Sequence, residues 1–341
     1  MLRLIAYVLG CLLAAMPAVA AEPLRIFVAH AQRHDPGGDT AAAAAEEFRD
    51  RVAQLSGGRM KVEILAEGVT GGNRDTTALV EKGVIHSALV TLGGVTPVFK
   101  PLSVIQLPYA FASLDDASRV LDGPFGRRLA DEMAARTRLR LVGFVDPTGF
   151  YILTNSDRPV RDPEEMWGLR LRAIPGSKPL EAMIRAVGAK PVRVSSREEL
   201  SALATGVVDG QMNPAATVLA RGFDRVQHYA TLTDHLYVPY VWVFNRAFLD
   251  GLPPEDAALL RQAAEDGRRR AHQLAIAIHA NDMGAQGLRK RMEVVALDAG
   301  GRAAFKAALR PPAEAAIVEE IGDTGAEWMA AFKAATTPSR R

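Results

Sequence analysis

The chain has 341 residues, of which 48% are hydrophobic and 23% charged, an ordinary globular composition in a chain long enough for two domains. Lysine and arginine number 41 against 39 aspartate and glutamate, so the formal net charge is only +2. This near balance argues against a nucleic-acid surface, which needs a concentrated excess of basic charge. We therefore expect a globular protein that has no nucleic-acid partner.

The first 21 residues are typical of a cleavable secretory signal peptide. Arg3 supplies the positive charge, Leu4–Met16 form the apolar segment, and Ala18-Val19-Ala20 is a small-residue cleavage site. The apolar run is shorter than a membrane span requires, and no later segment approaches that length. The sequence therefore predicts export to the periplasm and a soluble mature chain.

The only cysteine, Cys11, lies inside this segment. The stretch from Val8 to Cys11 is similar to a lipoprotein processing site, which would give a membrane-anchored protein. However, the apolar run continues to Ala15, whereas a lipid-attachment cysteine normally closes it. Cleavage after Ala20 or Ala21 would leave a mature chain without cysteine. Such a chain could form no disulfide, cysteine–zinc site or thiol nucleophile.

The elements expected in the first half alternate between strand and helix. Alternating apolar residues predict a strand over 24–30, and Asp39 and Thr40 then cap an alanine-rich helix that ends at the glycines 57–58. A strand over 60–65 and a helix over 74–82 follow. This order predicts a mostly parallel sheet with helices on both faces.

The second half is expected to contain a second α/β unit. Strands are expected over 140–145, 149–155, 169–173, 191–194 and 207–211, with helices over 179–187 and 197–205. Ser196 and Glu199 fit a capping box for the second of these helices. Asn213 and Pro214 fit a cap and first-turn proline of the helix after it.

A long helix is expected near the C-terminal third. It opens at the prolines 253–254 and can continue to about Met283. At 1.5 Å per residue it would span about 40 Å, which is enough to cross between two lobes.

Arg172 is placed near the carboxyl end of the strand over 169–173. Ligands of open α/β sheets bind outside the carboxyl ends of the strands, and a guanidinium there offers a planar donor fork for a carboxylate. The alternative is a solvated arginine at a strand end.

Motifs of the common enzyme classes are absent. The sequence lacks HExxH, G-x-S-x-G and a Walker A loop. His272 and His279 fall on a predicted helix without metal-ligand neighbours, and the acidic run 162–165 suits a helix start better than a catalytic pair. We expect no enzymatic activity, no cofactor and no metal.

An ordered run over residues 158–214 resembles one protein family. It comprises Arg158-Pro159-Val160, Met166, Gly168-Leu169, Arg172, Gly188-Ala189, Pro191, Glu198, Ala202-Leu203, Thr205–Gln211 and Asn213-Pro214. Weaker matches are Gly57–Arg59, Gly71–Arg74, Leu107–Tyr109, Thr233 and His235. The run resembles the DctP-type solute-binding subunit of tripartite ATP-independent periplasmic (TRAP) transporters.

This resemblance implies an α/β, two-lobe periplasmic binding protein fold with a ligand cleft between the lobes and long inter-lobe helices. Lobe I would comprise residues 22–148 and 239–278, and lobe II residues 149–238 and 279–341, after a signal peptide over 1–21. The implied function is capture of an organic acid and its delivery to an ion-gradient-driven permease by a monomer. The alternative is a periplasmic ligand sensor that presents its closed form to a receptor.

The resemblance also implies roles for residues. Arg172 would grip the ligand carboxylate, and Asn213 would contact the ligand unless it only caps its helix. Tyr151 departs from the family, many members of which have an arginine two residues after the glycine that is Gly149 here. The missing cation favours a monocarboxylate over a C4-dicarboxylate, although Tyr151 could also be buried without ligand contact. Met212, where the family often has a glutamate, is a second departure.

The remaining candidates lie around the implied cleft. Glu198 matches a family glutamate and is expected to be structural. Asn73 and Arg74 would present donors from lobe I, where Arg74 could equally form an inter-lobe ion pair. The other pocket candidates are His30, Thr91 and Trp242, the last of which could also be a core residue.

Overall fold

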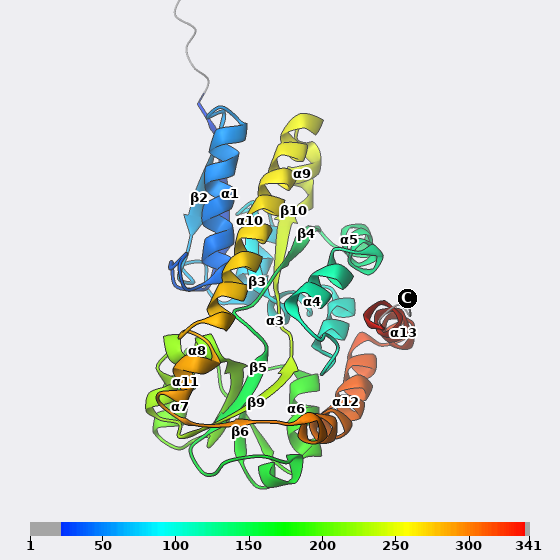
Figure 1. Ribbon diagram of the computed structural model, residues 1–341. Coiled ribbons are helices and arrows are strands. Elements are labelled where there is room, and N and C mark those ends of the chain that lie inside the picture. The colour runs from blue at the N-terminus through cyan, green and yellow to red at the C-terminus, as the bar shows by residue number, and fades with distance from the viewer. Residues whose placement is uncertain (1–21, 338–341) are drawn as a thin grey trace, which may run out of the picture.

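The computed structural model describes residues 22–337, so the predicted signal peptide and Cys11 lie outside the described residues. The chain folds into two α/β lobes, each built around its own sheet (Figure 1). Within the described range, no helix combines the length and apolar character needed to cross a membrane.

The lobe I sheet has five strands in the order β2-β1-β3-β10-β4. Their bounds are β1 Leu24–His30, β2 Met60–Leu65, β3 Ser87–Thr91, β4 Leu139–Val145 and β10 Tyr240–Asn245. Strands β1, β2 and β3 are parallel, but β10 is antiparallel to both of its neighbours. Because β4 is antiparallel to β10, it runs in the same direction as β1, β2 and β3, so the sheet is mostly parallel as predicted and β10 is the exception. The reason is that β10 enters the lobe from lobe II at the end where β4 leaves it, so the two strands must run in opposite directions.

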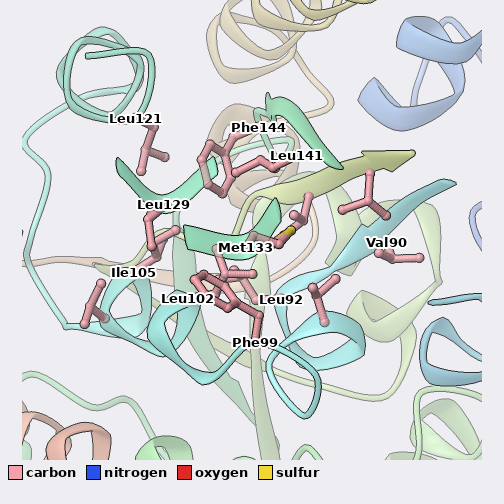
Figure 2. Close-up of a cluster of buried hydrophobic side chains, with 14 of the residues drawn as sticks. Val90, Leu92, Phe99, Leu102, Ile105, Leu121, Leu129, Met133, Leu141 and Phe144 are labelled. Atoms are coloured by element: carbon pink, nitrogen blue, oxygen red, sulfur yellow. The ribbon is translucent and has the colours of Figure 1, made fainter. Parts of the chain in front are cut away.

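Helices cover both faces of this sheet. They are α1 Thr40–Leu55, α2 Asn73–Glu81, α3 Leu92–Val95, η1 Lys100–Gln106, α4 Leu114–Leu121, α5 Pro124–Arg136, α9 Arg246–Gly251 and α10 Pro254–Ala280. On one face α1 and α10 enclose Phe48 and Trp242. On the other, a larger apolar cluster includes Phe99, Leu129 and Phe144 (Figure 2).

The lobe II sheet has six strands in the order β11-β9-β5-β8-β6-β7. Their bounds are β5 Tyr151–Asn155, β6 Arg170–Ala173, β7 Lys190–Arg193, β8 Gly210–Pro214, β9 Tyr229–Leu236 and β11 Glu293–Ala296. The helices are η2 Pro163–Met166, α6 Lys178–Ala186, α7 Glu199–Ala204, α8 Ala215–Ala220, η3 Phe223–Arg225 and α11 Ala285–Arg289. Strand β5 is antiparallel to β8 and β9, whereas β6 is parallel to β7 and β8.

Strand β8 begins three residues later than the sequence indicates. The Asp209 carboxylate accepts hydrogen bonds from the Arg170 backbone N–H at 2.7 Å and from its Nε at 3.1 Å. Gly206 has a φ of +68°, which ends α7 in a turn. Residues 206–209 therefore precede the strand, and Asn213 lies within β8 itself.

Three short connections join the lobes. The third, residues 281–284, leads from α10 to α11, and the first two, residues 146–150 and 237–239, are bonded to each other. The Tyr237 hydroxyl donates to Asp146 Oδ1 at 2.6 Å, and His272 Nδ1 of α10 lies 2.7 Å from Asp146 Oδ2. One buried carboxylate thus ties both connections to each other and to a lobe I helix.

The C-terminal helices α12 (Ala299–Ile321) and α13 (Gly325–Thr336) run along the side of the molecule (Figure 1). Phe305 and Leu309 of α12 join the lobe II core, whereas Ile317 joins the lobe I core. Trp328 and Phe332 of α13 pack on lobe I aromatic rings. The family resemblance places all of 279–341 in lobe II, but α13 packs on lobe I, where its aromatic residues join the larger apolar cluster.

Candidate functional site

Arg172 lies in β6 near its carboxyl end, as the sequence predicts, but it is not a solvated arginine. The residue is only 5% exposed, and its Nε donates a hydrogen bond to the Val194 carbonyl at 3.0 Å. Its Nη1 lies 3.6 Å from Oε1 of Glu199. The guanidinium is thus held near the carboxyl end of β6 by one carbonyl and one buried carboxylate.

Glu199 was not anticipated as a site residue. It is 1% exposed and accepts hydrogen bonds from Asn213 Nδ2 at 2.9 Å and from Arg221 Nη1 at 3.2 Å. Burial raises the pKa of the Glu199 carboxyl, while the charges of Arg172 and Arg221 act in the opposite direction. We refer to Arg172, Glu199, Asn213 and Arg221 as the Glu199 cluster.

The helical period could have identified Glu199. Ala202 and Leu203 are the buried apolar residues of α7, and Glu199 precedes them by three and four positions. It therefore shares their face, and Glu198 does not.

The predicted capping box of α7 is wrong by one residue. The exposed Glu198 accepts hydrogen bonds from the Ser195 hydroxyl at 2.5 Å and from the Ser195 backbone N–H at 3.3 Å. The pair predicted to form the box was Ser196 and Glu199. Glu198 thus stabilises the approach to α7 and leaves Glu199 free to point inward.

Asn213 does not cap α8, because Pro214 occupies the cap position. Its side chain is buried and donates to Gln211 Oε1 at 2.5 Å as well as to Glu199. From Gln211 the bonding continues to Thr154 at 2.7 Å and from there to Gln227 at 2.7 Å. This buried chain of hydrogen bonds fixes the orientation of the Asn213 amide.

Tyr151 opens β5 directly opposite Pro214 of β8. Burial raises the pKa of its phenol to about 12, with Arg172 lowering and Glu199 raising the pKa. The phenol therefore lies within the electrostatic reach of the Glu199 cluster.

Tyr240 extends the site to lobe I, where it opens β10. Burial raises the pKa of its phenol well above the usual value, the charges of Asp39 and Tyr151 raise it further, and Arg221 lowers it. Groups of both lobes thus act on the Tyr240 phenol.

Three other lobe I candidates lie around the start of α2. The Asn73 side chain accepts a hydrogen bond from the Thr91 backbone N–H at 3.2 Å. Arg74 donates to the Gly93 carbonyl at 3.4 Å and, across the lobes, to the Pro175 carbonyl at 3.5 Å. Arg74 therefore bridges the lobes through a carbonyl oxygen instead of an ion pair.

His30 and Trp242 are both fully buried. Neither ring nitrogen of His30 has a hydrogen-bond partner among residues 22–337. Trp242 lies in the core, where its ring packs edge-on against Phe48 and its N–H donates to Ser87 at 2.9 Å. Trp242 is therefore a core residue and not a pocket residue as expected, because the packing of α1 and α10 encloses the indole.

The buried histidines predict a loss of stability in acid. Burial lowers the pKa of both His30 and His235 from 6.5 to about 4. Between pH 6.5 and 4 each histidine is protonated in the unfolded state but neutral in the folded state. The free energy of unfolding is therefore unaffected above pH 6.5 and falls by about 3 kcal/mol per histidine as the pH drops toward 4. Urea unfolding of wild type and His30→Asn across this range should show a smaller loss in the variant. Equal losses would contradict the assignment of a neutral His30.

Residues 22–337 contain no group of three or more histidine, cysteine, aspartate or glutamate side chains arranged to hold a metal ion.

Comparison with known proteins identifies the family. The model of bacterial extracellular solute-binding protein, family 7 (DctP) matches residues 31–319. The C4-dicarboxylate-binding periplasmic protein DctP of Rhodobacter capsulatus is 30% identical over 325 residues, covering 94% of this chain and 93% of the relative.

Two crystal structures of similar proteins extend the comparison. A TRAP periplasmic solute-binding protein from Bordetella bronchispeptica, with density assigned as pantoate, is 27% identical with a TM-score of 0.79, covering 91% of this chain and 98% of that one. The sugar acid binding protein DctPAm of Advenella mimigardefordensis, in complex with galactonate, is 25% identical with a TM-score of 0.82, covering 92% and 98%. The chain therefore belongs to bacterial extracellular solute-binding protein family 7, the DctP-type binding proteins of TRAP transporters, and is a solute-binding protein and not an enzyme.

Proposed function

We propose that this chain captures a monocarboxylic acid between its lobes in the periplasm and delivers it to the membrane subunits of a TRAP permease. Arg172 binds the carboxylate, and Asn213 and Tyr151 orient the ligand. Asn73, Arg74, Thr91 and His30 contribute from lobe I.

The charge of the Glu199 cluster carries this proposal. Two guanidinium groups, Arg172 and Arg221, share the single carboxylate of Glu199 at 3.6 and 3.2 Å. Arg172 and Glu199 are buried, whereas Arg221 is exposed, so one net positive charge is left over beside the buried pair, and one ligand carboxylate neutralises it. A second carboxylate would require another cation, but Tyr151 stands where many family members have an arginine.

The known ligands of relatives are compatible with either class of acid. Galactonate and pantoate, found with two similar proteins, carry one carboxylate each, whereas the Rhodobacter capsulatus relative is named for C4-dicarboxylates. The charge of the cluster favours the monocarboxylates for this chain.

Closure of the lobes follows from ligand binding. The ligand favours the closed arrangement to the extent that it contacts both lobes in that arrangement only. Tyr240 and Arg74 supply the lobe I side of such contacts, since both face lobe II groups.

A thermal-shift screen with matched ligand pairs tests the function. The chain from Glu22 onward is unfolded and refolded to remove bound ligand, then heated with galactonate or galactarate and with succinamate or succinate. Each pair differs by one carboxylate. A ligand at a hundredfold excess over its Kd stabilises the native state by about 2.7 kcal/mol. We expect the monocarboxylate of a pair to raise Tm and its dicarboxylate to have little effect; equal or inverted shifts would contradict the proposal.

A further inference from the structure

The N-terminal end of α1 faces lobe II. Figure 1 shows this end of the helix above α8. Ala43 in the first turn of α1 packs with Ala216 of α8 and with Leu274 and Ile278 of α10. Ala216 follows Asn213 by three residues, so the start of α1 lies beside the segment that carries a member of the Glu199 cluster.

Asp39 occupies this helix end with its own carboxylate. Its side chain accepts a hydrogen bond from the Ala42 backbone N–H at 2.9 Å. The N-terminus of a sixteen-residue helix is a favourable place for an anion, so it would suit the distal carboxylate of a dicarboxylic ligand. In this chain the Asp39 carboxylate already occupies the N-terminus of α1.

Two buried polar side chains at this end of the lobe are neutral. The Thr40 hydroxyl is fully buried without a hydrogen-bond partner in the described part of the chain, as are both ring nitrogens of His30. Unsatisfied neutral groups of this kind suit hydroxyl or amide partners and do not neutralise a second carboxylate.

Electrostatics connect Asp39 to the cluster across the lobes. The Asp39 charge and the Tyr151 phenol both raise the pKa of Tyr240, and Arg221 lowers it, so all three act on the same phenol. Burial raises the pKa of Asp39 itself to about 6, which leaves the group largely ionised at neutral pH.

We infer that Asp39 is a specificity-determining residue that excludes ligands with a second carboxylate from the space between the lobes. This inference rests on the proposed function, since it concerns which acids the Arg172 site accepts. Arg172 admits one carboxylate on lobe II, and Asp39 repels another on lobe I, where burial weakens the screening of like charges.

Two variants test this inference without uncapping α1. Serine and asparagine are both good N-cap residues, so Asp39→Ser and Asp39→Asn remove the charge and keep the cap. The control is Asp35→Asn, which removes the same charge from an exposed residue of the preceding loop. Affinities for galactonate, galactarate, succinamate and succinate are measured by titration calorimetry near neutral pH, after urea unfolding has verified that each variant is folded.

We expect both Asp39 variants to bind the dicarboxylate of a pair at least about tenfold more tightly than wild type, with a change below about threefold for the monocarboxylate. Asp35→Asn should change neither. If wild type binds the monocarboxylate but the Asp39 variants leave the ratio of affinities unchanged, the inference fails and the proposed function stands. The same gain in Asp35→Asn would also overturn it, because a long-range field would then explain the selectivity. If wild type binds no acid, both fail together.

Discussion

Replacement of Arg172 by alanine is expected to weaken binding of the acid by at least about tenfold, because a charge-assisted hydrogen bond contributes about 1.5–3 kcal/mol. The total loss reaches about 2–5 kcal/mol if the ligand carboxylate stays buried without a partner. Arg172→Lys is expected to bind nearly as poorly. An ammonium cannot keep the hydrogen bond to Val194 and present a planar fork to the ligand at the same time.

The matched control lies two residues earlier on the same strand. Arg170 is exposed, and its side chain is occupied by Asp209. Arg170→Lys should therefore leave the affinity unchanged in titration calorimetry with the monocarboxylate found by the screen. Undiminished affinity in Arg172→Lys would show that the carboxylate binds elsewhere.

Replacement of Glu199 by glutamine should destabilise the fold more than any change at its exposed neighbours. Removing one partner from a buried ion pair typically costs about 3–5 kcal/mol. Here two guanidinium groups lose their shared anion; Arg221 is partly exposed, which places the expected loss near about 3 kcal/mol. Urea unfolding should show a lower midpoint with an unchanged slope.

Glu198→Gln serves as the control for this measurement. Glu198 is adjacent and exposed, and the substitution is chemically the same. The free energy of unfolding should therefore change by no more than about 0.5 kcal/mol, beyond any weakening of the hydrogen bond with Ser195. Similar losses in the two variants would mean that Arg172 and Arg221 are satisfied by carbonyl oxygens alone.

Local patterns predicted much of lobe I. The bounds of β1 and β2 agree with the sequence analysis, because alternating apolar residues mark both strands and Gly57-Gly58 separates α1 from β2. Asp39 caps α1 as expected. These features depend on neighbours in the sequence, which is the information that propensity and periodicity contain.

Features set by distant partners were missed. Val207 and Val208 have the composition of a strand, but the bonds between Asp209 and Arg170 turn the chain there and delay β8. The antiparallel entry of β10 depends on the path through lobe II. Whether Trp242 lines a pocket or the core was settled by Phe48 and the α10 backbone near Gly267, far away in sequence.

The family was identified correctly from the run over 158–214, because an ordered series of short matches is specific even where each piece is weak. The roles that the resemblance implies for individual residues remain predictions. Met212 illustrates their limit. It packs in the lobe II core, on the face of β8 opposite Asn213, so its departure from the family says little about the charge around a ligand.

The tie between Asp146, Tyr237 and His272 determines what kind of motion the lobes can make relative to each other. Asp146 and Tyr237, the first residues of two of the three connections, are fastened to α10, and the third connection, residues 281–284, continues directly from α10. Within the first two connections, rotation is confined to residues 147–150 and 238–239, where Pro147 and Pro239 restrict it further. Helix α12, which packs on the cores of both lobes, further restricts this rotation. Connections restrained in this way have little conformational entropy to lose when the lobes close, so most of the ligand's interaction free energy remains available for affinity.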